Sequence, residues 1–118
     1  VCLMAYRPTW DEYFGWIAEM VSSRATCPRA EVGAVLVKDN RIIGTGYNGS
    51  PPGEPHCRDV GCDVVDDHCQ RAIHAEVNAV VHTTADIRGA KLYLYDSLGR
   101  DEPCRECAKV LRSGGISW

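Results

Sequence analysis

The stretch Arg71-Ala72-Ile73-His74-Ala75-Glu76-Val77-Asn78-Ala79 begins a helical pattern, and Pro103-Cys104-Arg105-Glu106-Cys107 begins a second one. Together they contain a histidine and a closely spaced pair of cysteines. A catalytic zinc ion takes three nitrogen or sulfur donors from its protein and keeps a fourth position open for water. We therefore predict that His74, Cys104 and Cys107 bind one catalytic zinc ion.

The spacing within these stretches predicts a role for each residue. Cys104 and Cys107 are three positions apart at a helix start, so they point the same way, and the positive end of the helix favours their thiolate forms. Glu76 follows His74 by two positions and can reach the open metal position without filling it. H-x-E followed by P-C-x-x-C is the signature of zinc deaminases, in which hydroxide attacks the amine-bearing ring carbon of cytosine or adenine. We predict that Glu76 is the catalytic acid and base.

Two other interpretations of the cysteines have to be weighed. A lone C-x-x-C could be a redox pair, or it could be half of a structural zinc site. If the cysteines only held a structural zinc ion, the chain would be a non-catalytic zinc module. A secreted domain would use its cysteines as a disulfide framework. The cysteine count is odd and the sequence shows no secretory signal, so metal ligation is favoured. The seven cysteines are Cys2, Cys27, Cys57, Cys62, Cys69, Cys104 and Cys107.

Composition limits the classes of protein to which the chain can belong. The 118 residues, of which 45% are hydrophobic and 25% charged, fit one compact domain over 1–118. The net charge of -3 offers no broad cationic surface, so nucleic acid is not an expected partner. No apolar run approaches the roughly 20 residues of a membrane span. We expect a cytoplasmic protein.

Periodicity predicts an alternation of helices and strands. Thr9 and Glu12 form a capping box before a first helix, and Gly114-Gly115 ends the last one. A helical crossover between the second and third strands predicts a mixed α/β sheet with helices packed on it. The expected elements are helix 10–23, strands 32–37 and 42–47 joined as a hairpin, an irregular loop 48–70, helix 71–81, strand 91–95 and helix 104–113.

The chain resembles the deoxycytidylate (dCMP) deaminase family of the cytidine deaminase superfamily. The resemblance extends from Arg7 to Ile116 and includes both metal-ligand stretches. Its other motifs are Arg7-Pro8-Thr9-Trp10-Asp11-Glu12-Tyr13, Ala25-Thr26-Cys27, Val32-Gly33-Ala34-Val35, Gly46-Tyr47-Asn48-Gly49-Ser50-Pro51 and His56-Cys57.

The resemblance implies a three-layer α/β/α fold and hydrolysis of dCMP to dUMP and ammonia, a step towards dTTP. It also implies a homo-oligomer, a hexamer or a dimer or trimer, with dCTP and dTTP as effectors beside positions 46–49. Residues expected to contact substrate or effector are Gly46, Tyr47, Asn48, Gly49 and Ala75. The basic residues that could bind the phosphate are Arg24, Arg29, Arg58 and Lys109.

A second, structural zinc site is expected in the cysteine-rich region, as in many members of this family. Its four ligands would be Cys27, Cys57, Cys62 and Cys69, with His56 and His68 as neighbouring substitutes. Such a site would explain the long loop, because zinc supplies folding energy that the few apolar residues there cannot.

The sequence departs from the family pattern in two places. The link from Asp96 to Glu102 is longer than usual and is expected beside the active site, so substrate choice stays open between dCMP, dCTP, a nucleoside, a free base and transfer-RNA adenosine. Glu102-Pro103-Cys104 would suit the RNA enzymes, whereas the Gly-Tyr-Asn-Gly-Ser-Pro run favours dCMP. The chain ends at Trp118, where the family continues, so the C-terminal strands and helix are expected to be truncated.

Overall fold

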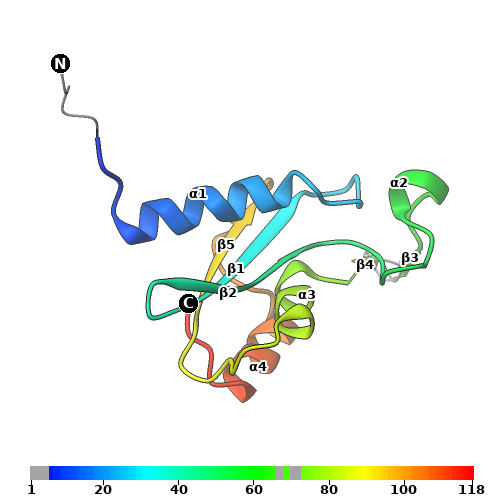
Figure 1. The fold of residues 1–118 in the computed structure, drawn as a ribbon. Helices are drawn as coiled ribbons and strands as arrows, with labels where there is room; N and C mark the ends of the chain where they lie inside the picture. Colours follow the sequence, from blue (N-terminus) through cyan, green and yellow to red (C-terminus); the bar gives the residue numbers. More distant parts are fainter. Residues whose placement is uncertain (1–5, 66–67, 70–72) are drawn as a thin grey trace.

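The computed structural model describes residues 6–65, 68–69 and 73–118 and has a three-stranded sheet between helices (Figure 1). β1 (Val32–Lys38) is the central strand, with β2 (Arg41–Tyr47) on one side and β5 (Lys91–Asp96) on the other. Both pairings are antiparallel. α1 (Trp10–Ser22) covers one face of the sheet, and α3 (Ala75–His82) and α4 (Arg105–Ser113) lie on the other.

The central strand is buried on both faces because its side chains alternate between two cores. Ala34 and Leu36 belong to the core beneath α3 and α4, whereas Val35 and Val37 pack with Phe14 and other residues of α1. This arrangement confirms the three-layer α/β/α fold.

Two local sequence signals for these elements are confirmed. The hairpin has a two-residue turn in which Asp39 and Asn40 have φ angles of 53° and 58°, the left-handed conformation that a type I′ turn needs. At the start of α1, the Glu12 backbone N–H donates to Thr9 Oγ1 over 3.2 Å, and the Thr9 backbone N–H donates to Glu12 Oε1 over 3.1 Å. These reciprocal bonds form the predicted capping box.

Both helices of the metal-ligand stretches start later than predicted. Ile73 exchanges backbone hydrogen bonds with Gly49, of 2.8 and 3.1 Å, and α3 then begins at Ala75 with His74 as its N-cap. Arg71 and Ala72 lie outside the described residues. α4 begins at Arg105 with Cys104 as its N-cap, so Pro103 lies before the cap rather than in the first turn.

The loop predicted as irregular contains three short elements. They are the one-turn helix α2 (Cys57–Val60) and the strands β3 (Val64–Val65) and β4 (His68–Cys69), which pair with each other. The sheet gains a parallel component at its edge, where Lys91 and Ser117 form a bridge. Among the described residues no helix is long and apolar enough to span a membrane.

Candidate metal centre

The structure brings together the three donors predicted for a catalytic metal. Nδ1 of His74 lies 3.2 Å from Sγ of Cys107 and 3.4 Å from Sγ of Cys104, and all three atoms lie within 4.8 Å of one another. Zinc bonds of about 2.0 Å to nitrogen and 2.3 Å to sulfur in a tetrahedron set neighbouring donors roughly 3.5 to 3.8 Å apart. The donor set therefore fits a zinc ion by chemistry and by spacing.

Two helix N-termini supply this group. His74 is the N-cap of α3 and Cys104 the N-cap of α4, and neither side chain makes a capping hydrogen bond to its helix. Cys107 follows in the first turn of α4. A helix N-terminus carries partial positive charge and unpaired N–H groups, and all three donor residues lie at such an end.

The group is closed on one side and open on the other. Cys107 is buried, whereas His74 and Cys104 are exposed. Burial, and next the nearby Glu76 carboxylate, raise the pKa of the Cys107 thiol in the metal-free protein. Zinc binding must therefore displace a proton from this thiol.

Glu76 lies beside the metal ligands, in the first turn of α3. Its side chain is buried and lines a cavity of about 100 Å³ together with His74 and Cys104. A carboxylate there can exchange protons with a molecule held next to the metal. The structure thus places Glu76 next to the three donors, and its role as catalytic acid and base stays a prediction.

The longer link after β5 forms another wall of this cavity. Asp96, Arg100 and Glu102 all line it. The loop was expected beside the active site, and the structure places it there. Arg100 was not among the predicted phosphate-binding residues, although the Asp-x-x-x-Arg spacing at the end of a strand was a signal for an ion pair.

The residues predicted to contact substrate or effector occupy other positions. Asn48 is buried, its Oδ1 accepts a 3.0 Å bond from the Val32 N–H, and its Nδ2 donates over 2.7 Å to the Ala30 carbonyl. Gly46 and Tyr47 line a separate cavity of about 200 Å³. Gly49 is paired with Ile73, and Ala75 is fully buried. Their contacts with a ligand remain predictions.

Asn78, which was not among the predicted site residues, joins α3 to the end of β2. It is buried on α3, and its Nδ2 donates a 2.8 Å bond to the Tyr47 carbonyl at the end of β2. The sequence does hold a signal for it: Asn78 is a polar residue within an apolar helical pattern, and a buried amide needs a hydrogen-bond partner.

A second sulfur cluster is formed by cysteines outside the two metal-ligand stretches. The Sγ atoms of Cys27, Cys57 and Cys62 are within 4.8 Å of one another, and Cys27 and Cys62 are 3.9 Å apart. Cys69 lies on β4, but its side chain, like that of His68, is outside the described part of the structure. Three of the four predicted structural ligands are thus together.

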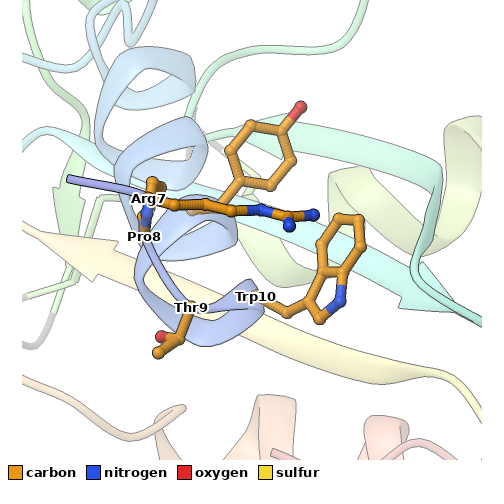
Figure 2. A pocket seen from close by; sticks show the side chains of 5 residues that line it. Arg7, Pro8, Thr9 and Trp10 are labelled. Carbon is orange, nitrogen blue, oxygen red and sulfur yellow. The ribbon is translucent and has the colours of Figure 1, made fainter. Parts of the chain in front are cut away.

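A larger cavity, of about 680 Å³, lies away from both clusters. Arg7, Pro8, Thr9, Trp10 and Tyr13 line it at the start of α1, and Figure 2 shows the Arg7 side chain extending towards Trp10. None of these residues is a metal ligand or a carboxylate. The cavity therefore offers no group for metal-assisted hydrolysis.

Comparison with known proteins identifies a family. Residues 8–117 match the model of the cytidine and deoxycytidylate deaminase zinc-binding region. The dCMP deaminase from cyanophage S-TIM5, solved in complex with dCMP and dUMP, has a similar structure. Its TM-score is 0.76 at 30% identity, over 95% of this chain and 79% of that chain.

Similar sequences differ widely in length. ComE operon protein 2 of Bacillus subtilis is 42% identical over 113 aligned residues, which cover 93% of this chain and 57% of that protein. Deoxycytidylate deaminase of Mycobacterium phage D29 is 41% identical over 122 aligned residues, which cover 93% of this chain and 91% of that protein. In the Saccharomyces cerevisiae enzyme of the same name the match covers 36% of the protein. The chain thus spans little more than half of the Bacillus protein.

Proposed function

The chain belongs to the cytidine and deoxycytidylate deaminase zinc-binding family, and on that premise we propose that it is a zinc-dependent hydrolase that converts dCMP into dUMP and ammonia. One observation carries the proposal: His74, Cys104 and Cys107 converge, and Glu76 lines the same cavity. The relatives named deoxycytidylate deaminase, and the cyanophage enzyme with dCMP and dUMP, support this substrate.

In the proposed mechanism the chain's residues move protons and hold the base. His74, Cys104 and Cys107 would hold a zinc ion, which would supply Lewis-acid chemistry that lowers the pKa of water. Glu76 accepts the proton of the attacking water and passes it to the ring nitrogen beside the amine-bearing carbon. It then takes the proton of the newly added hydroxyl group and delivers it to the leaving amino group, which departs as ammonia while the carbonyl group forms. The apolar walls formed by Val32 and Leu94 exclude water around the base.

A substrate panel tests the proposal. The zinc-loaded protein is assayed for ammonia release with dCMP, dCTP, cytidine, guanine and transfer RNA. We expect dCMP to give the highest kcat/KM. Activity on transfer RNA alone would replace dCMP by an adenosine substrate, and no activity on any of them would favour the non-catalytic zinc module.

We further propose two zinc ions per chain. The second binds Cys27, Cys57 and Cys62, with Cys69 as the fourth ligand, and replaces an apolar core for the loop that carries α2. A reducing compartment such as the cytoplasm would keep these thiols free for metal.

Effectors and self-association complete the proposal. dCTP and dTTP would bind beside 46–49, where Ser50 and His56 line the same cavity as Gly46 and Tyr47. Ser50 and His56 each have a buried polar atom, Ser50 Oγ and His56 Nδ1. Both atoms are buried without a hydrogen-bond partner among the described residues. A homo-oligomer would cover the exposed side chains of Trp10, Trp16 and Met20 on α1. Sedimentation velocity with and without dCTP tests both points.

A further inference from the structure

We propose that Arg100 binds the 5′-phosphate of the nucleotide at the mouth of the metal cavity and so determines the preference for a nucleotide over a nucleoside. This inference rests on the deaminase function proposed above. Arg100 belongs to the link in which the chain departs from the family pattern, outside the H-x-E and P-C-x-x-C stretches.

The charge around the cavity points to this residue. Arg100 is the one lysine or arginine among the described residues that line the cavity, whereas three of them, Glu76, Asp96 and Glu102, are acidic. A phosphate dianion entering such surroundings would be repelled without a cation beside it. The basic residues expected for this role from the sequence, Arg24, Arg29, Arg58 and Lys109, do not line the cavity.

The size of the cavity places the phosphate outside it. About 100 Å³ is well below the roughly 300 Å³ or more that encloses a whole ligand, so the base enters and the sugar and phosphate remain at the mouth. The exposed fractions of two side chains agree with a phosphate at the mouth of the cavity. The Arg100 side chain is 61% exposed, whereas that of its partner Asp96 is 6% exposed.

The guanidinium group of Arg100 is already oriented. Its Nε donates a 2.6 Å hydrogen bond to Asp96 Oδ2. That bond uses one edge of the planar group and leaves the two terminal nitrogens available. A guanidinium presented in this way can donate two parallel hydrogen bonds to phosphate oxygens.

The loop that carries Arg100 is held in place before any ligand binds. Asp96 Oδ1 accepts a 2.8 Å bond from the Leu98 N–H, and Gly99, at a φ of 80°, closes the turn by donating to the Asp96 carbonyl over 2.9 Å. Ser97 exchanges two 2.9 Å bonds with the Glu31 backbone, through its own N–H and its hydroxyl. Because the loop is ordered in advance, a ligand would lose little free energy in ordering it.

Comparing substrates with and without phosphate tests the assignment. In Arg100→Ala we expect kcat/KM for dCMP to fall about 10- to 100-fold, mainly through KM, because a charge-assisted contact is lost. The kcat/KM for deoxycytidine should stay within about twofold. Arg100→Lys should retain part of the dCMP rate, since it keeps charge but not the two parallel bonds. Arg41 is an exposed arginine on β2, and Arg41→Ala is the matched control. This variant should change kcat/KM for neither dCMP nor deoxycytidine.

Equal losses for dCMP and deoxycytidine, or no loss, would overturn the assignment. A binding measurement separates it from the proposed function. By calorimetry, the zinc-loaded protein should bind dUMP at least about tenfold more tightly than deoxyuridine, and Arg100→Ala should abolish that preference. If the protein deaminates neither substrate, the proposed function fails, and the binding measurement alone decides whether Arg100 binds the phosphate. A preference that survives in Arg100→Ala, or its absence from the unaltered protein, would then refute the role of Arg100.

Discussion

At the scale of single residues, the proposed chemistry depends on Glu76, a carboxylate that is buried beside the predicted metal ligands. Glu76 is 5% exposed and shares its cavity with His74 and Cys104. We expect Glu76→Gln to lower kcat at least 100-fold, because the amide cannot accept the proton of water. Zinc content should be unchanged, since the three donors remain. Steady-state kinetics and metal analysis of the same preparation check both points.

Glu19→Gln is the matched control for this change. Glu19 is exposed on α1, away from the cavity, so its variant should keep full activity. A Glu76→Gln protein that retains turnover would remove the carboxylate from the mechanism. One that loses zinc would make Glu76 a metal ligand instead.

At the scale of elements, close contact between β2 and α3 sets the position of His74 and Glu76. A Cβ at Gly46 would lie 2.3 Å from the Ala79 backbone nitrogen and 2.4 Å from the Ala75 carbonyl oxygen. Gly46→Ala should therefore lower the free energy of unfolding by about 1–3 kcal/mol and displace α3. Urea denaturation, with activity measured alongside, tests this.

Gly15→Ala provides the comparison, because a Cβ there meets no atom within 4 Å and the residue lies inside α1. Helix propensity predicts a gain of about 0.5–1 kcal/mol. If both alanine variants behave alike, close packing at Gly46 is not what holds the two elements together.

The contact between α1 and β5 predicts a pH dependence. The Tyr93 hydroxyl donates to Asp11, and Lys91 Nζ lies 3.4 Å from Asp11 Oδ1. The hydrogen bond from Tyr93, and next the charge of Lys91, lower the pKa of Asp11. Burial, and next the bond to Asp11, raise the pKa of Tyr93 to about 12.

The signs of these shifts define two pH windows. A lowered Asp11 pKa stabilises the fold above the unfolded value of about 3.9, and this stabilisation is lost as the pH falls through the folded pKa. A raised Tyr93 pKa stabilises it below about 10, and this is lost as the pH rises to about 12. Tyr93→Phe should weaken both dependences, whereas Tyr95→Phe should leave them. Unfolding curves from pH 2 to 12 that coincide in shape for all three proteins would contradict the contact.

At the scale of the whole molecule, the two cysteine clusters belong to different elements: one lies at the starts of α3 and α4, and the other includes Cys57 on α2. We expect two zinc ions per chain by metal analysis. Cys57→Ser should lose one ion and lower the melting temperature by about 10 °C or more, because structural zinc contributes directly to folding. Cys104→Ser should lose the other ion together with all activity and keep the first. A single ion in the unaltered protein, or both lost in Cys57→Ser, would contradict two independent sites.

Patterns local in the chain were sufficient for much of this protein. The capping box at Thr9, the hairpin at Asp39 and Asn40 and the alternation along β1 follow from neighbouring residues, so the fold class was predictable. The residues at which helices start were less predictable. α3 begins two residues after Ile73 because that residue pairs with Gly49, a contact between distant parts of the chain.

The sequence by itself determined which residues have the chemistry for the site, because H-x-E and P-C-x-x-C are local spacings with a specific donor set. Only the tertiary structure decided what surrounds them. It directs the Asn48 side chain to the Ala30 and Val32 backbone, and it places Arg100 rather than the expected basic residues on the cavity. The physical reason is that a cavity wall forms where separate loops and helices meet, and no spacing along the chain encodes that meeting.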